Sequence, residues 1–243
     1  MTGRTNVALV AGVGDGLGGA VARRFARGGY MTVLVARSAD RLARIAGDIE
    51  AAGGRGIAYV ADLREETAVG KLFDDVEAQI GPIGVAVFNT GANFRASILD
   101  TPADMFEKVW RLGCYAGFLV GREAARHMVP RGQGTILFTG ATASLRGSSQ
   151  FAAFAAAKGG VRQVAQSMAR ELGPQGIHVA SVIVDGMIDS PRVRERFSER
   201  VAQLPEDGML KPADIAEVYW QLAHQPRSAW TFEIDLRPWA EKF

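Results

Sequence analysis

Short runs of apolar and β-branched residues recur along the chain in a pattern that is typical of buried strands. Seven such runs lie at residues 6–12, 31–36, 56–62, 85–91, 134–140, 178–185 and 230–236. Between them, apolar residues return every three or four positions, which indicates helices with one buried face. These helical segments cover residues 17–27, 39–52, 65–80, 103–128, 151–172 and 213–223.

The alternation of the two patterns predicts the fold class. Strands that are apolar on both faces are typical of a parallel sheet covered by helices on each side. We therefore expect an α/β fold with a doubly wound, seven-stranded parallel sheet. No Pro-, Gly- or Ser-rich linker and no repeat interrupts the alternation, so residues 1–243 are interpreted as one domain.

Composition and charge narrow the classes of function. With 28 Lys+Arg against 26 Asp+Glu, the net charge is +2, so neither nucleic acid nor an anionic membrane is expected as a partner. No apolar run approaches the roughly 20 residues that span a bilayer, and residues 7–11 are too few for a signal-peptide core. A single cysteine, Cys114, excludes an intramolecular disulfide and favours a cytoplasmic location. The three histidines lack metal-ligand spacing, so no metal is expected.

A glycine-rich turn separates the first predicted strand from the first predicted helix. It reads Gly12-Val13-Gly14-Asp15-Gly16-Leu17-Gly18-Gly19. Glycine permits positive φ and lets the backbone approach a pyrophosphate, whose charge then lies at the helix N-terminus. The turn therefore favours a phosphate-bearing ligand, and a turn that serves only tight packing is the alternative.

The spacing of Gly12, Gly16 and Gly18 resembles the TGxxxGxG turn of the short-chain dehydrogenase/reductase family, with Ala11 at the threonine position. The resemblance extends along nearly the whole chain and implies a Rossmann-type fold that binds a nicotinamide dinucleotide. In this turn it assigns cofactor contacts to Gly12, Asp15, Gly16, Leu17 and Gly18.

Later strand ends carry the rest of the resemblance. Asp62-Leu63 looks like the family's adenine contact, and Asn89-Thr90-Gly91 is similar to its Asn-Asn-Ala-Gly motif, with Phe88 at the first asparagine. After the sixth strand, Asp185-Gly186 stands where the family has Pro-Gly. The residues that resemble the following carboxamide and phosphate contacts are Ile188 and Ser190. Residues of about 186–211 would then form a substrate lid, whose arginines either favour an anionic substrate or simply face solvent.

The residues after the second predicted strand bear on the choice of cofactor. A carboxylate there would accept hydrogen bonds from the ribose of NAD, but the chain has Ala36 followed by Arg37. A guanidinium suits a phosphate, so NADP(H) is favoured over NAD(H). Asp15 argues the other way, because NADP-preferring relatives often carry a basic residue in the turn. A solvated, capping role for Arg37 is the alternative.

The resemblance weakens at the catalytic centre. The family uses a tyrosine, a lysine four residues later, a serine thirteen residues before the tyrosine, and an asparagine in the preceding long helix. These positions hold Phe154, Lys158, Ala141 and Cys114. A phenyl ring has no proton to donate and alanine cannot hydrogen-bond a carbonyl, so carbonyl chemistry is compromised. Lys158 would still anchor the nicotinamide ribose, and a surface lysine is the alternative.

Another proton donor would have to replace the tyrosine. The candidates are Thr139, Thr142, Ser144, Tyr115, Asp185 and Asp189. Each has a structural alternative, because hydroxyls after a strand commonly cap turns, Tyr115 lies one residue off the expected helix face, and acids are common at helix N-termini. Cys114 is interpreted as a small buried residue, since nothing around it in sequence marks a reactive thiolate.

Three functions are compatible with these features. The favoured one is an NADP(H)-dependent oxidoreductase of short-chain dehydrogenase/reductase type, with an atypical active site and an unknown small-molecule substrate. The second is a non-catalytic NADP(H)-binding pseudoenzyme or interaction protein, suggested by the three replaced side chains. The third is non-redox chemistry, as in epimerases or dehydratases on related folds. The resemblance also implies a homodimer or homotetramer, formed through the helices that begin near Ala103 and Phe151.

Overall fold

A computed structural model describes residues 7–241 of the chain. Within this range, seven strands form one sheet in the order β3-β2-β1-β4-β5-β6-β7, and all neighbouring strands are parallel. The strands are β1 Val7–Ala11, β2 Met31–Ala36, β3 Arg55–Val60, β4 Ile83–Phe88, β5 Gly134–Ala141, β6 Ile177–Val184 and β7 Glu233–Leu236. The structure confirms the predicted seven-stranded parallel sheet. Asn6, the expected first residue of the first strand, lies outside the described residues.

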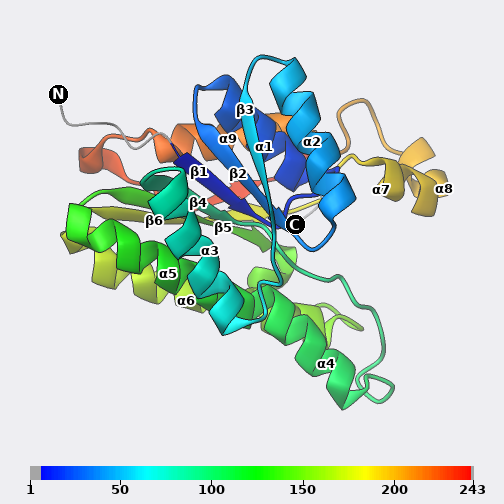
Figure 1. Ribbon diagram of the computed structural model, residues 1–243. Coiled ribbons are helices and arrows are strands. Elements are labelled where there is room, and N and C mark those ends of the chain that lie inside the picture. Colours follow the sequence, from blue (N-terminus) through cyan, green and yellow to red (C-terminus); the bar gives the residue numbers. More distant parts are fainter. Residues whose placement is uncertain (1–6, 242–243) are drawn as a thin grey trace.

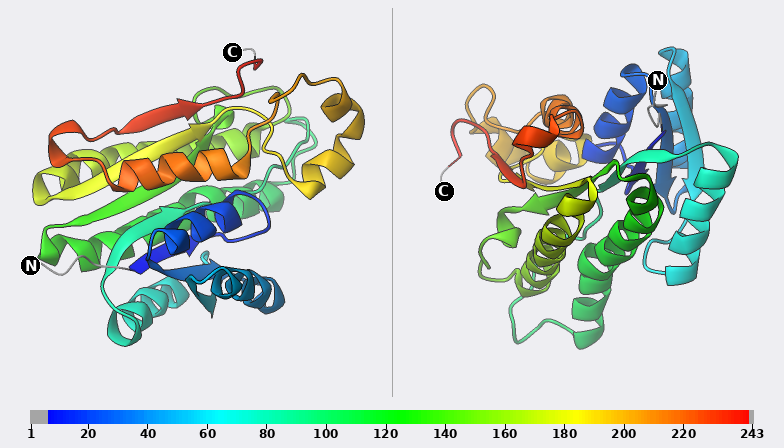
Figure 2. Two further views of the ribbon diagram at one scale, coloured as in Figure 1. Left: turned by 90° about the horizontal axis from the view of Figure 1, so that it is seen from above. Right: turned by 90° about the vertical axis from the view of Figure 1, so that its left-hand side faces the viewer.

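Helices cover both faces of the sheet, as predicted (Figures 1 and 2). One face carries α1 Leu17–Arg27, α2 Ala39–Ala51 and α9 Pro212–Ala223, and the other carries α3 Glu66–Gln79, α5 Ala116–Met128 and α6 Ala152–Leu172. Because both faces are covered, every residue of β1, β4 and β6 is buried. None of the helices in residues 7–241 combines the length and apolar character needed to cross a membrane.

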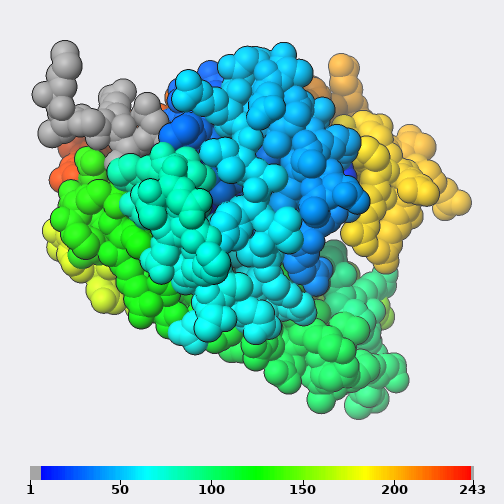
Figure 3. All heavy atoms as spheres, viewed as in Figure 1, coloured from blue at the N-terminus to red at the C-terminus, as the bar shows by residue number. Residues whose placement is uncertain are grey.

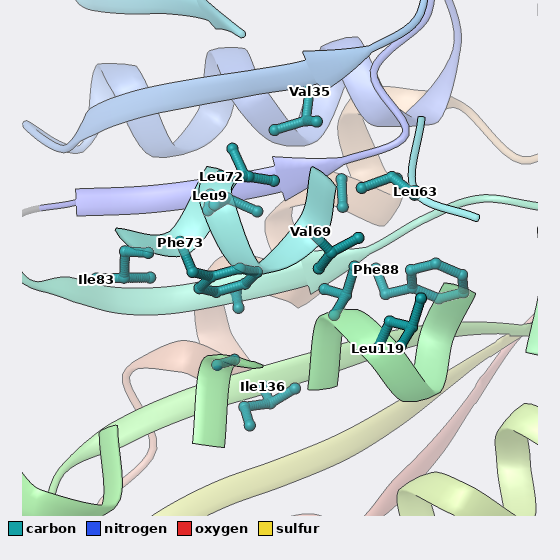
Figure 4. Close-up of a cluster of buried hydrophobic side chains, with 14 of the residues drawn as sticks. Leu9, Val35, Leu63, Val69, Leu72, Phe73, Ile83, Phe88, Leu119 and Ile136 are labelled. Atoms are coloured by element: carbon teal, nitrogen blue, oxygen red, sulfur yellow. The ribbon is translucent and has the colours of Figure 1, made fainter. Parts of the chain in front are cut away.

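Two large hydrophobic cores lie on the opposite faces of the sheet. Leu9 of β1 belongs to the core that includes Phe73 of α3 and Leu119 of α5 (Figure 4). The next residue, Val10, belongs to the core that includes Phe25 of α1 and Tyr219 of α9. The two-residue period of strand side chains produces this division. The two cores hold the helices against the sheet and thereby fix the positions of the strand ends.

The ends of β1 and β4 form the point at which the sheet changes its winding direction. β1 leads into α1 on one face, whereas β4 leads toward α5 on the other. In open α/β sheets, ligands bind at the carboxyl ends of the strands at such a switch point. The backbone N–H of Asn89 donates to the Ala11 carbonyl at 2.8 Å, so the segments that follow β1 and β4 meet there.

A π-helical turn lies within the segment 103–128, which was expected to be helical. α4 spans Ala103–Trp110, the π turn spans Arg111–Tyr115, and α5 follows directly. The Leu112 carbonyl in this turn accepts a hydrogen bond from Thr90 Oγ1 at 2.7 Å. The whole segment is helical, as expected, but hydrophobic periodicity does not reveal the wider turn within it.

The segment 186–211, the expected lid, contains the short helices α7 Pro191–Arg196 and α8 Ser198–Ala202. It projects from the body of the molecule beyond the carboxyl ends of the strands (Figures 1 and 3). Single turns of 3₁₀ helix lie at Val129–Arg131, Thr142–Ser144, Gly173–Gln175 and Arg227–Ala229.

Candidate functional site

The glycine turn after β1 is held by backbone contacts that explain some of its glycines. Gly12 has a φ of +100°, and a Cβ there would lie 2.8 Å from the Asn89 carbonyl oxygen. A Cβ on Gly18 would overlap the Gly12 carbonyl oxygen. Packing therefore requires these two glycines. In contrast, a Cβ on Gly14 or Gly16 would meet no atom within 4 Å, so packing does not account for them.

The N-terminus of α1 lies open beside this turn. Gly16 is its N-cap residue, no side-chain hydrogen bond caps the helix, and its first turn holds no acidic residue. The first N–H groups of a helix lack intrahelical partners and carry a partial positive charge. Open space at Gly16 beside such a helix end fits the phosphates of a dinucleotide. Leu17 and Gly18, the next two residues, are buried.

The charge of Asp15 is compensated by α2. Its carboxylate pairs with Arg44, and Arg41 Nε lies 3.5 Å from its other oxygen. Asp15 was expected to disfavour NADP(H), and its pairing with these two arginines was not predicted. Their position at the start of the second helical segment was the available signal, although the pairing spans 29 residues. Asp15 thus presents a neutralised carboxylate to a ligand rather than an isolated one.

Asp62, just after the end of β3, is tied to Arg64. Arg64 Nε donates to Asp62 Oδ1 at 2.9 Å, and the Arg64 backbone N–H donates to the same oxygen at 3.0 Å. Hydrogen bonds from Arg64 lower the pKa of Asp62 to about 2, and the charge of Arg37 contributes. Arg37 is exposed, so its guanidinium remains accessible, whereas Leu63 is buried. Two cations thus lie near the carboxyl ends of β2 and β3.

Lys158 is the central polar side chain of the site. Its Nζ donates to the Thr90 carbonyl at 3.1 Å and to the Thr139 carbonyl at 2.7 Å. The side chain reaches across from α6 to the segment after β4 and to β5. A Cβ on Gly91 would lie 3.3 Å from this Nζ, so the glycine leaves room for it. Asn89 Nδ2 donates to the Gly12 carbonyl at 3.2 Å, which links this region to the glycine turn.

Lys158 is buried, with 5% of its surface exposed, so the alternative of a surface lysine is wrong. Within residues 7–241 no carboxylate lies at ion-pair distance from it. Burial lowers the pKa of Lys158 to about 8. An ammonium held by carbonyls without a neutralising acid is suited to hydroxyl or phosphate oxygens of a ligand.

The other three tetrad positions carry no proton donor equivalent to tyrosine. Cys114 lies in the π turn and is buried, and burial raises the pKa of its thiol. Its Sγ lies against Gly160, where an added Cβ would approach within 2.6 Å, which agrees with a packing role. Phe154 is half-buried on α6, and Ala141 ends β5. None of these side chains can protonate an alkoxide as a tyrosine does.

Several of the alternative donors are already engaged elsewhere. Thr139 Oγ1 hydrogen-bonds Tyr219 Oη at 2.6 Å in the core beneath α9. Ser144 Oγ accepts from the Ala141 backbone N–H at 3.1 Å, as a turn cap does. Tyr115 stacks on Trp110 with ring centroids 6.2 Å apart. Thr139 Oγ1 is thus bonded to Tyr219 and Ser144 Oγ to its own turn, whereas stacking engages the ring of Tyr115 and not its hydroxyl.

The residues after β6 form contacts among themselves. Both oxygens of Asp189 accept from Arg194, at 2.6 and 2.7 Å, and these bonds lower the pKa of Asp189. The hypothesis that Asp189 relays a proton is therefore wrong, because a relay would need a raised pKa. Ser190 caps α7 by accepting from the Val193 N–H at 3.3 Å, and Ile188 forms an isolated bridge with Leu210.

Gly186 and the lid arginines complete this region. Gly186 has a φ of +145°, and a Cβ there would lie 2.7 Å from Pro238 Cδ, so the chain requires glycine at this point. The lid arginines, which are all exposed, are Arg192, Arg194, Arg196 and Arg200. Arg194 is paired with Asp189, and a solvated face accounts for the charges of the other three. In the described part of the chain, no cluster of three or more His, Cys, Asp or Glu residues could hold a metal ion.

Comparisons with known proteins agree with this geometry. The family model described as short chain dehydrogenase matches residues 6–201. A solved short-chain dehydrogenase from Rhodopseudomonas palustris is 46% identical, with a TM-score of 0.83, over 96% of this chain and 98% of that chain. A metagenomic short-chain oxidoreductase solved in complex with NADP is 26% identical, with a TM-score of 0.82, over 97% of this chain and 98% of that one.

Comparison with a named reductase gives the same result. The 3-oxoacyl-[acyl-carrier-protein] reductase of Mycobacterium tuberculosis is 30% identical over 90% of this chain and 86% of its own length. The residues that the family model matches include the glycine turn, six of the seven strands and Lys158. The chain belongs to the short-chain dehydrogenase family.

Proposed function

We propose that this chain is an oxidoreductase that binds NADP(H) and transfers hydride between it and a small carbonyl or alcohol substrate. The observation that carries the proposal is the buried Lys158 ammonium, held by the Thr90 and Thr139 carbonyls at the switch point. Membership of the short-chain dehydrogenase family and the NADP of the metagenomic relative support it.

The residues at the switch point fit a nicotinamide dinucleotide. Gly16 leaves open space at an uncapped helix N-terminus, where the pyrophosphate would lie. Lys158 would hold the nicotinamide ribose, and Asp62 with Leu63 would meet the adenine. The remaining expected contacts after β4 and β6 are Asn89, Gly91, Gly186, Ile188 and Ser190. When bound, the dinucleotide supplies or accepts a hydride.

We infer that the preference is for NADP(H), because cations gather where its extra phosphate would lie. Arg37 is exposed after β2 and close enough to Asp62 to lower its pKa, and Arg41 and Arg44 neutralise Asp15. A planar guanidinium binds phosphate well.

Replacement of Arg37 tests this preference. Arg37→Ala is expected to weaken NADPH binding about 10-fold while the Kd for NADH stays the same, because a charge-assisted contact is worth roughly 1.5–3 kcal/mol. Calorimetric titration measures both constants. Arg55→Ala, an exposed arginine at the opposite end of the sheet, is the control. Equal losses for NADPH and NADH would contradict a phosphate contact.

The lowered pKa of Lys158 predicts a pH dependence. A ligand that binds the ammonium prefers the protonated form, so its affinity is full below the pKa of the free protein and falls above it. Because that pKa is about 8, NADPH affinity is expected to decrease as pH rises through 8, by at most about 10-fold per pH unit. Titrations at several pH values measure this slope. If NADPH affinity did not change with pH in wild type, as in Lys158→Met, contact between NADPH and the Lys158 ammonium would be excluded.

The alternative is a non-catalytic NADP(H)-binding protein. Phe154, Ala141 and Cys114 favour it, because they remove the family's proton donor and carbonyl ligand. Oxidation of NADPH by the purified protein, with acetoacetyl-coenzyme A and 2,3-butanedione as probe ketones, separates the two. Turnover above the protein-free rate supports the enzyme. Tight NADPH binding without turnover supports the alternative. Assembly as a homodimer or homotetramer remains part of either proposal.

A further inference from the structure

One pair of side chains at the active-site edge of the sheet is not explained by packing or capping alone. Thr142 Oγ1 donates a hydrogen bond to Asp185 Oδ1. The pair spans the carboxyl ends of two neighbouring strands, since Ala141 of β5 is in register with Val184 of β6. Thr142 and Asp185 are the residues that follow these two.

The Asp185 carboxyl group belongs to a buried residue, with 4% of its surface exposed. Its backbone N–H donates to the Leu236 carbonyl at 2.8 Å, which fixes the residue between β6 and β7. Among the ion pairs of residues 7–241, none involves Asp185. This contrasts with Asp189 and Asp62, whose oxygens are held by arginines. A buried carboxyl group with a hydroxyl partner can exchange a proton through that hydroxyl.

Thr142 lies next to one of the four tetrad positions. It directly follows Ala141, the residue at the family's serine position, and it is half-buried rather than enclosed. Lys158 Nζ binds the carbonyl of Thr139, three residues earlier in the chain. The hydroxyl of Thr142 and the ammonium of Lys158 therefore belong to the same end of β5.

We propose that Thr142 is the catalytic residue that replaces the missing tyrosine, and that Asp185 acts through it as the proton store. This inference rests on the proposed function. The hydrogen bond between Thr142 Oγ1 and Asp185 is the path along which a proton can pass between the carboxyl group and the hydroxyl, and the hydroxyl in turn exchanges its proton with the substrate oxygen.

The proton transfers balance in both directions. In reduction, the substrate carbonyl carbon gains the hydride, and its oxygen takes the proton of Thr142 Oγ1 as that O–H bond breaks. Thr142 takes the proton of the Asp185 carboxyl group in the same step. Asp185 is left as a carboxylate and regains a proton from water. Oxidation of the alcohol reverses these transfers.

Variants that conserve shape separate proton transfer from packing. Thr142→Val keeps the volume and loses the hydroxyl, Thr142→Ser keeps the hydroxyl, and Asp185→Asn keeps a polar group without an acidic proton. Ser144→Ala, in the same turn, is the control. Thermal unfolding and NADPH titration establish that each variant folds and binds cofactor before its turnover is compared.

With acetoacetyl-coenzyme A and 2,3-butanedione as probes, Thr142→Val and Asp185→Asn are expected to lower kcat by about 100-fold, the scale of general acid catalysis. Thr142→Ser and Ser144→Ala should stay within about threefold of wild type, and the Kd for NADPH should not change. Adding Ala141→Ser and Phe154→Tyr to Thr142→Val should restore turnover. Infrared spectra should also show a shift of the Asp185 carboxyl band in Thr142→Val.

The outcomes distinguish the relay from the proposed function. If Thr142→Val binds NADPH and turns over like wild type, the relay is wrong and the oxidoreductase stands. If wild type binds NADPH but reduces neither probe, both the oxidoreductase and the relay are contradicted. If Thr142→Ser is as impaired as Thr142→Val, the hydroxyl is not the active group and the relay is likewise wrong.

Discussion

Lys158→Met is expected to weaken NADPH binding by about 10- to 100-fold. The ammonium is buried and bound to two carbonyls, so it is held in place before a ligand arrives. Hydrogen bonds to a charged group contribute roughly 1.5–3 kcal/mol, which corresponds to this range of affinity. Methionine has a similar length and tolerates buried surroundings, so the variant is expected to fold. Calorimetric titration with NADPH measures the loss.

Lys71→Met is the matched control, because Lys71 lies on α3 with 70% of its side chain exposed. It should leave the Kd for NADPH unchanged. Unchanged affinity in Lys158→Met, with normal thermal unfolding, would show that Lys158 serves the fold and not the cofactor.

Gly18→Ala is expected to lower the free energy of unfolding by about 1–3 kcal/mol and to abolish tight NADPH binding. Its Cβ would overlap the Gly12 carbonyl oxygen and would lie 2.9 Å from Asn89 Nδ2. The first neighbour is backbone and cannot rotate away, so the turn itself must move. Denaturant unfolding measures the stability, and titration measures the binding.

Gly14→Ala tests whether this effect comes from the clash. Gly14 lies in the same turn, but a Cβ there would meet no atom within 4 Å. The free energy of unfolding of Gly14→Ala should therefore stay within about 0.5 kcal/mol of wild type or rise slightly. A similar loss of stability in both variants would mean that the turn is sensitive to any side chain and that the Gly12 contact is unimportant.

The fold could be predicted because its signals are local and repeated. Leu9 and Val10 are both apolar and face different cores, which is what a strand covered on both sides requires. The ends of α1 and α3 were predicted within one residue, because the apolar period stops there. The π turn at Arg111–Tyr115 was missed, because the apolar period continues through it.

The sequence positions of the site residues could be predicted, but the contacts between their side chains could not. Glycine spacing indicated the turn, yet the pairing of Asp15 with Arg44 depends on how α2 lies against it. Similarly, the three hydroxyls of residues 139, 142 and 144 look equivalent in sequence. Their partners are Tyr219, Asp185 and the Ala141 backbone N–H, which are fixed only by tertiary packing. Of these three hydroxyls, only that of Thr142 has a carboxyl group as its partner.

The two halves of the site differ in how far they keep the family pattern. The cofactor half retains its glycine turn and Lys158, whereas Phe154 and Ala141 alter the catalytic half. Hydride transfer depends chiefly on the first half and proton transfer on the second. A protein with this combination is expected to bind cofactor normally, and its rate is expected to depend on a different proton donor.

Calorimetric titration of the purified, cofactor-stripped protein with NADPH and with NADH is the most direct test of NADP(H) binding by this chain. We expect one NADPH site per chain and binding at least about 10-fold weaker for NADH, because the cations around Arg37 have no phosphate to contact in NADH. Binding of neither dinucleotide would contradict a cofactor site, since the glycine turn and Lys158 would then serve only the fold.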